Sequence, residues 1–185
     1  MVTLSSLWLP TVLSAVFVFI ASSIIHMVLK YHQNDYGKLA GEEQVLAAMR
    51  EASVQPGNYA FPRVCDMKEM GEADTIEKYN NGPVGIVNIT PNGVPNMPKH
   101  LVMWFIYSLV ASLFVAYVCS FTMNAGTDYR MVFRLASVVA FLAYAGATAS
   151  ESIWKGQRWS TTFKTWIDAL IYGLLTGGTF GWLWP

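Results

Sequence analysis

The stretch LVMWFIYSLVASLFVAYVCSFTM, residues 101–123, contains 23 consecutive residues without a charge. An α-helix rises about 1.5 Å per residue, so a run of this length spans the ~30 Å hydrocarbon core of a bilayer. Three further runs have the same character: Leu7–Leu29, Met131–Ser150 and Phe163–Trp184. The sequence therefore predicts an all-α integral membrane protein with four transmembrane helices, at about residues 7–29, 101–123, 131–150 and 163–184.

The distribution of charge along the chain supports this class. The 185 residues include 12 basic and 12 acidic side chains, and the net charge is zero. Only three of these charged residues fall within the four apolar runs: Arg134, Lys164 and Asp168. A soluble globule would not segregate its charges in this way. A neutral chain without a basic patch is also not expected to bind nucleic acid.

The basic residues near the helix ends predict the orientation of the protein in the membrane. Six lie on one side and two on the other: Lys30, Lys38, Lys99, Lys155, Arg158 and Lys164 against Arg130 and Arg134. Cytoplasmic loops are the richer in Lys and Arg, so we expect both termini outside and residues 30–100 in the cytoplasm. This 71-residue segment is expected to be mixed and partly irregular, with short helices at Gly41–Ala52 and Ala73–Asn80 and a strand at Val84–Thr90.

The last apolar run carries two different stripes of residues. Gly173, Gly177 and Gly181 recur at every fourth position and form two overlapping GxxxG motifs on one face. Small residues let membrane helices approach closely, so this face either closes the bundle of four helices or docks a second subunit. Asp168, Tyr172, Thr176 and Thr179 form a polar stripe on another side, which either lines a cavity or hydrogen-bonds within the bundle.

Four ionisable residues are expected at a similar depth near the cytoplasmic boundary. They are His26, His100, Glu151 and Asp168, each within about one turn of the inner end of a predicted helix. Ionisable residues in membrane segments usually face the bundle interior and pair with one another. Three interpretations remain open: a structural network that includes a Lys164–Asp168 pair, a proton- or substrate-handling site, and a metal or haem site with His26 and His100 as ligands.

The sequence offers little catalytic chemistry. It contains no CxxC or CxxCH motif, no Gly-rich phosphate loop, no GxSxG and no HExxH. Its two cysteines, Cys65 and Cys119, are expected on opposite sides of the membrane and make no disulfide framework. Enzymatic activity is therefore not expected, and no cofactor is expected beyond the haem or divalent metal ion that the histidines allow.

The plan resembles an uncharacterised group of small bacterial inner-membrane proteins with four helices and a domain of unknown function. The resemblance is carried by Lys30-Tyr31-His32 after the first run and by the ending of the chain: Ile153-Trp154-Lys155-Gly156, Lys164, Asp168, Gly173 and Trp182-Leu183-Trp184-Pro185. It covers both ends of the chain but not residues 30–100. It implies a bacterial inner (plasma) membrane location and transfers no activity.

Three functions follow as hypotheses. The first is a non-enzymatic structural or accessory subunit of a membrane complex, whose partners are the lipid bilayer and other membrane subunits or further copies of the chain. The second is a small oligomeric transporter or channel that uses the polar residues at the inner end. The third is a membrane protein that binds a metal ion or haem.

Overall fold

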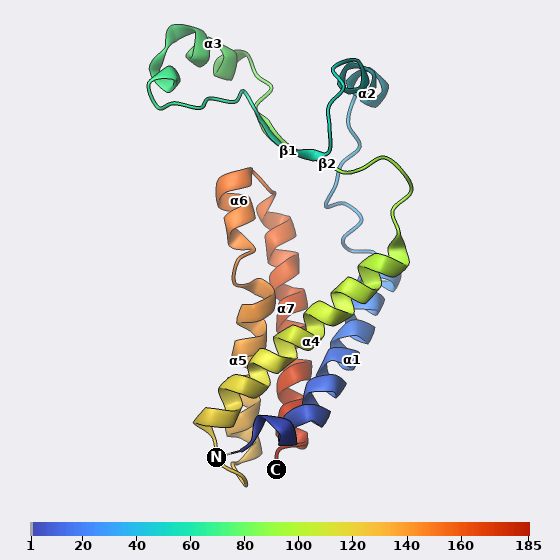
Figure 1. Cartoon of the computed structure of the whole chain (residues 1–185), viewed down its shortest axis with the longest axis vertical. Coiled ribbons are helices and arrows are strands. Elements are labelled where there is room, and N and C mark those ends of the chain that lie inside the picture. Colours follow the sequence, from blue (N-terminus) through green and yellow to red (C-terminus); the bar gives the residue numbers. More distant parts are fainter. Residues whose placement is uncertain (1) are drawn as a thin grey trace. The chain divides into compact units, whose positions relative to one another are not determined.

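The computed structural model describes residues 2–185, and the fold is mostly helical, with 66% of the chain in helices. The chain divides into two compact units (Figure 1). Unit 1 consists of Met1–Asp35, Asn96–Ser152 and Gln157–Pro185. Unit 2 consists of Tyr36–Pro95 and Ile153–Gly156.

Unit 1 is built from helices whose starts are set by local sequence. In chain order the elements are η1 (Leu4–Leu7), α1 (Trp8–Ser23), the π-helical η2 (Ile24–Val28), α4 (Met97–Thr122), α5 (Tyr129–Ala145), α6 (Ala149–Lys155), whose last turn belongs to unit 2, and α7 (Trp159–Trp182). The Asn96 side chain caps α4 by accepting from the Lys99 N–H at 3.1 Å. Asp128 caps α5 by accepting from the Arg130 N–H at 2.9 Å. Such caps satisfy backbone donors that have no partner inside the helix.

Within the described part of the chain, three helical stretches are long and apolar enough to cross a membrane. They are Leu4–Val28, Met97–Thr122 and Tyr129–Lys155. Each overlaps one of the spans predicted from the sequence. The fourth expected span corresponds to α7, which has 24 residues but is less apolar because it carries several glycines and threonines and Asp168.

The expected helix 131–150 is interrupted in the structure. α5 ends at Ala145, and the chain becomes helical again at Ala149 as α6. Between them the Thr148 hydroxyl donates to the Ala145 carbonyl at 2.8 Å, and the Ser150 hydroxyl donates to the Ala147 carbonyl at 2.6 Å. These hydroxyls satisfy two carbonyls at the interruption between the helices.

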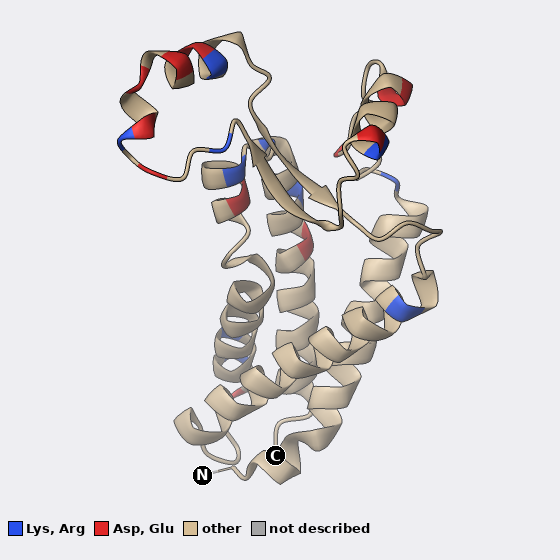
Figure 2. Ribbon diagram, turned by 45° about the horizontal axis from the view of Figure 1, so that its top comes forward, with Lys and Arg blue, Asp and Glu red and all other residues tan. Residues whose placement is uncertain are grey.

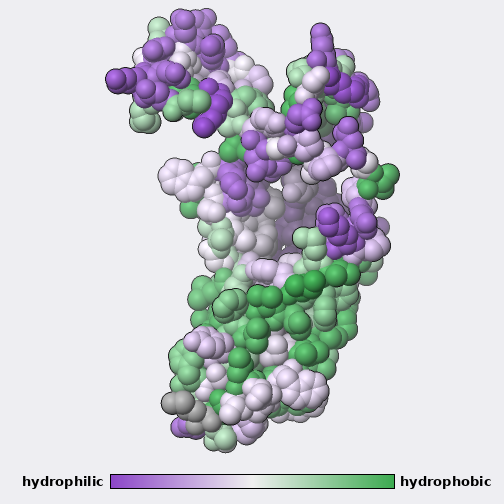
Figure 3. Space-filling view, viewed as in Figure 1, coloured by the Kyte–Doolittle hydropathy of each residue, from purple (hydrophilic) through white to green (hydrophobic). Residues whose placement is uncertain are grey.

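The surface of α4 has the character expected of a helix in lipid. Its buried side chains are small: Ser108, Ala111, Ser112, Ala116 and Cys119, with Val115 the largest. Its exposed side chains are large and apolar: Val102, Met103, Ile106, Val110, Leu113, Phe114 and Phe121 among them. Hydrophobic residues accordingly cover much of the helical surface in view (Figure 3). In water this arrangement would be unfavourable, whereas in a bilayer large apolar side chains face the lipid and small ones pack between helices.

The glycine face of α7 packs against α5 of the same chain. A Cβ atom added to Gly173 would lie 2.9 Å from the Ser137 carbonyl oxygen, and one added to Gly181 would lie 2.7 Å from the Tyr129 ring. At Gly177 it would meet the Ser137 side chain and, at 2.7 Å, the Phe133 carbonyl oxygen. The two helices therefore approach as closely as only glycine permits.

The remaining helices pack around this pair. α1 contacts both α4 and α7, and α4 contacts α5. The polar stripe of α7 lies inside, because Asp168, Tyr172, Thr176 and Thr179 are all buried. At the end of the chain, the Trp184 indole N–H donates to the Asn124 carbonyl at 3.0 Å. The Gly126 N–H also donates to the Pro185 carbonyl at 2.6 Å, so the end of the chain is hydrogen-bonded to the loop between α4 and α5.

Unit 2 carries most of the charged residues (Figure 2) and little core. Its two strands, β1 (Gly57–Phe61) and β2 (Gly85–Ile89), pair antiparallel, with Gly57 opposite Ile89. Helices α2 (Glu42–Glu51) and α3 (Ala73–Asn81) occupy the stretches where the sequence predicts short helices, and η3 (Glu69–Gly71) precedes α3. No side chain between residues 36 and 95 is fully buried.

Candidate functional site

The end of α1 brings two histidines together. The last turns of this helix are π-helical, with the Leu29 N–H bonded to the Ile24 carbonyl at 3.1 Å, and they carry His26. Lys30 then adopts a left-handed conformation with φ 55°, which ends the helix and starts two successive turns. As a result the rings of His26 and His32 lie with their centroids 4.6 Å apart. Single π-turns within helices are frequent at functional sites.

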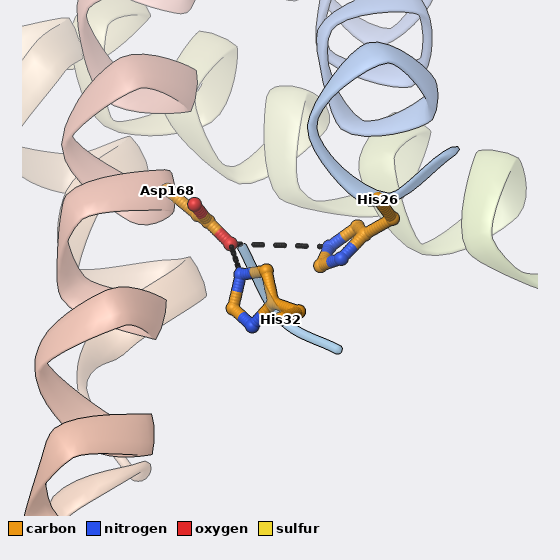
Figure 4. A group of neighbouring side chains, drawn as sticks. All are labelled: His26, His32 and Asp168. Atoms are coloured by element: carbon orange, nitrogen blue, oxygen red, sulfur yellow. Dashed lines mark hydrogen bonds and ion pairs between the residues drawn. The ribbon is translucent and has the colours of Figure 1, made fainter. Parts of the chain in front are cut away.

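Asp168 of α7 faces both histidines (Figure 4). The Oδ2 atom of this carboxylate lies 2.8 Å from Nε2 of His32 and 3.8 Å from Nε2 of His26. One ligand atom from each residue lies within 4.8 Å of the other two. This group, the His–Asp site, joins the end of α1 to α7 and belongs entirely to unit 1.

A second carboxylate, that of Asp35, contacts His32 at the ring nitrogen that does not face Asp168. Its Oδ2 atom accepts from Nδ1 of His32 at 2.5 Å, and its Oδ1 atom accepts from the Lys164 ammonium at 2.5 Å. Lys164 also donates to the Tyr31 carbonyl at 2.7 Å. Burial by itself favours the neutral form and raises the pKa of Asp35, but the hydrogen bonds from Lys164 and His32 outweigh it and hold the pKa below its usual value. Lys164 thus pairs with Asp35 and not with Asp168, the partner expected from helical spacing.

Several buried polar atoms beside the site have no hydrogen-bond partner among the described residues. They include Oδ1 of Asp168, whose side chain is only 5% exposed, the indole Nε1 of Trp104 and the hydroxyls of Tyr144 and Tyr172. An unsatisfied buried donor or acceptor costs about 1–3 kcal/mol, and more when it is charged. A ligand that supplied the missing partners would recover this free energy.

A cavity of about 320 Å³ adjoins the His–Asp site. His26, His32 and Asp168 line one part of it, together with Thr165 and Ala169. Four aromatic side chains line the rest: Trp104, Tyr107, Tyr144 and Tyr172. Their rings are in mutual contact, with centroids 5.2 Å apart for Tyr144 and Tyr172 and 6.1 Å for Trp104 and Tyr172. The wall therefore offers aromatic ring faces together with the hydroxyls of Tyr144 and Tyr172, while the end at the His–Asp site carries ionisable groups.

The structure assembles half of the cluster expected from the sequence. It brings His26 and Asp168 together, and it adds His32 and Asp35. His100 lies exposed in the first turn of α4, and Glu151 lies half-buried in α6; neither belongs to the His–Asp site or lines the cavity. A signal for the missed residues exists in the sequence, because His32 and Asp35 are three residues apart and directly follow the polar end of the first apolar run.

The site has the composition of a transition-metal site. Zn²⁺ takes imidazole nitrogens and carboxylate oxygens at about 2.0–2.2 Å, so its tetrahedral ligands lie ~3.4 Å from one another. The spacings of 2.8 Å and 3.8 Å around Asp168 bracket that value. A haem held on both faces would need its two imidazoles further apart than the rings of His26 and His32 lie.

In comparisons with family models, curated proteins and solved structures, nothing matches the chain.

Proposed function

We propose that the protein is a four-span membrane protein that binds one divalent transition-metal ion, of the Zn²⁺ type, at the His–Asp site. The observation that carries the proposal is the convergence of ligand atoms from His26, His32 and Asp168 to within 4.8 Å of one another. Two nitrogens and one oxygen form a ligand set that suits Zn²⁺ and its neighbours in the first transition series.

The second carboxylate supports a metal ion over a plain ion pair. A metal-bound histidine almost always donates its other ring N–H to a carboxylate or carbonyl, which fixes the ring and makes it a better ligand. Asp35 occupies this position at Nδ1 of His32, and Lys164 in turn holds Asp35. His32 is therefore already oriented with Nε2 toward Asp168.

The charge of the site supports a cation as ligand. The carboxylates of Asp35 and Asp168 flank the two ring nitrogens of His32 and share one ammonium, that of Lys164, so the second negative charge must be balanced by a second proton on His32 or by a bound cation. An uncompensated charge buried beside a membrane is costly unless it is paired or coordinates a metal. A divalent cation supplies that pairing and also a partner for the second oxygen of Asp168.

The positions of the first helix and the C-terminus in unit 1 support four membrane crossings. η1 and the C-terminus lie at the same end of this unit (Figure 1), as an even number of crossings requires. Three spans are apolar enough by themselves, and α7 supplies the fourth with its polar stripe buried against its neighbours. The basic residues favour a topology with residues 30–100 in the cytoplasm, so the metal would bind near the cytoplasmic face.

A protein that binds a metal ion at this site could still have either of two roles predicted from the sequence, that of a structural subunit or that of a transporter. A structural or accessory subunit with a bound metal ion needs no catalysis, and its partners would be other membrane subunits. The cavity beside the site favours a second candidate, transport of the ion or of a small solute. For that candidate, vesicles containing the protein should take up Zn²⁺, and vesicles containing the His32→Ala variant should not.

Calorimetric titration of the metal-free protein in detergent tests the proposal. We expect one Zn²⁺ per chain, with affinity lowered at least tenfold by His26→Ala, His32→Ala or Asp168→Asn. His100→Ala is the matched control, because this exposed histidine lies outside the site, and it should bind as wild type. Absence of binding, or an equal loss in the His100→Ala variant, would overturn the proposal. His26 is 47% exposed, so its replacement tests the site even if the buried Asp168 proves necessary for folding.

A further inference from the structure

We propose that the cavity beside the His–Asp site binds a carboxylate with an apolar body, whose head completes the coordination of the metal ion. This inference rests on the proposed metal site. The structure supplies three ligands, and a Zn²⁺-type ion with three protein ligands keeps a fourth position for water or for an incoming ligand. The cavity is lined by all three ligand residues, so a fourth ligand can reach the metal from it.

The charge balance selects an anion. Two carboxylates, one ammonium and a divalent ion, with neutral histidines, give the loaded site one excess positive charge. A monoanionic head neutralises this charge, whereas an amine would add to it. Carboxylate oxygen is also a ligand that Zn²⁺ binds readily.

Trp104 supplies a donor for the same head. Its indole N–H is buried and has no partner among the described residues, and its ring lines the cavity. A carboxylate has two oxygens, so one can bind the metal while the other accepts from this N–H. Indole nitrogen is a donor only, which again excludes an ammonium head.

The faces of the four aromatic rings favour an apolar body, and the hydroxyls of Tyr144 and Tyr172, which have no partner among the described residues, can donate a hydrogen bond to it or accept one from it. Trp104 stacks on Tyr107 with centroids 5.5 Å apart, and Tyr144 lies edge-on to Tyr107 at 5.7 Å. Tyr107 is 43% exposed on the side of α4 that also exposes Met103, Ile106 and Val110, so the rim of the cavity borders the surface expected to face lipid. A volume of about 320 Å³ is at the lower end of the ~300–1,000 Å³ range of small-molecule sites. It suits a head with one ring or a short chain.

Cobalt substitution tests the inference, because the visible spectrum of bound Co²⁺ changes when its fourth ligand changes. We expect a saturable spectral change with benzoate or octanoate, and at least tenfold weaker binding for acetate, which lacks a body to bury. Benzylamine should give no change. A change with benzoate alone assigns an aromatic acid as the ligand, and a change with octanoate alone assigns a lipid-derived acid. Equal affinities for acetate and the larger acids, or no change with any acid, would overturn the inference.

Trp104→Phe provides the variant, with Trp159→Phe as its matched control on the exposed start of α7. The first should weaken carboxylate binding about tenfold, the usual effect of losing a hydrogen bond to a charged group, and leave Co²⁺ affinity unchanged because Trp104 is not a ligand. The control should change neither. Unaltered carboxylate binding in the Trp104→Phe variant would contradict the assigned donor. Failure of Co²⁺ itself to bind would instead refute the proposed metal site, so the two failures are distinguishable.

Discussion

Lys164 and Asp35 are 129 residues apart in the chain, yet the ammonium of one lies 2.5 Å from the carboxylate of the other. This contact ties the turn after α1 to α7, and Lys164 strengthens it by also donating to the Tyr31 carbonyl. The turn carries His32, so the ion pair fixes the position of a proposed metal ligand. The Asp35 side chain is 7% exposed and that of Lys164 is 25% exposed, so the contact is partly shielded from water.

Replacing Lys164 by Met should destabilise the metal-free protein. The change keeps most of the side-chain volume but leaves the Asp35 carboxylate with one partner fewer in a buried position, at a cost of about 1–3 kcal/mol. Thermal unfolding in detergent measures the effect. Lys99→Met removes an exposed ammonium at the start of α4 and should change stability by less than about 0.5 kcal/mol. Equal stability of the two variants would show that the Lys164–Asp35 pair contributes nothing to stability.

Asp35→Asn should weaken metal binding without removing a ligand. The amide keeps the shape of the side chain but loses the charge that orients and polarises His32. Loss of such an outer partner typically costs about 10–100-fold in metal affinity. Zn²⁺ titration of the variant measures the change. Wild-type affinity would mean that His32 needs no orienting carboxylate, and a complete loss of binding would mean that Asp35 is itself a ligand.

The positions of His26 and Asp168 near the ends of their helices could be predicted from the sequence, but the directions in which the ionisable side chains point could not. Apolar runs fix where a helix leaves the membrane, and His26 and Asp168, each near such an end, lie 3.8 Å apart. The same reasoning grouped His100 and Glu151 with them. Depth says nothing about the direction of a side chain around its helix, and the break after Ala145 places Glu151 on a separate short helix, α6.

His32 and Asp35 can be noticed in the sequence after the first apolar run, but the backbone features that bring them to the site have no sequence signature. A π-helical turn and a left-handed non-glycine residue, Lys30, shape the end of α1 and bring His32 beside His26. Left-handed conformations usually involve glycine or asparagine, so Lys-Tyr-His gives no warning of one. The apolar spans, by contrast, follow from composition alone, which is why three of them overlap the predicted ranges.

The orientation of the protein can be tested with its own cysteines. Cys65 is exposed in unit 2, whereas Cys119 is buried in α4. If residues 30–100 are cytoplasmic, a membrane-impermeant maleimide should label Cys65 only after the cells are permeabilised. Pro185→Cys should add a site that is labelled in intact cells, and Cys65→Ser should abolish the permeabilisation-dependent signal. Labelling of Cys65 from outside intact cells would reverse the proposed topology.

Substitutions at two adjacent glycines of α7, Gly177 and Gly178, can distinguish the effect of close helix packing from the effect of helix propensity. A Cβ at Gly177 would collide with the Ser137 side chain and lie 2.7 Å from the Phe133 carbonyl, whereas at Gly178 the nearest atom would be the Tyr129 hydroxyl at 4.0 Å. Gly177→Ala should therefore force α5 and α7 apart and cost about 1–3 kcal/mol. Gly178→Ala should stabilise the helix by up to ~1 kcal/mol, since alanine is the better helix former. Thermal unfolding and size in detergent distinguish the causes: a Gly177→Ala variant of unchanged stability but smaller assembly would place this face against a second subunit instead of α5.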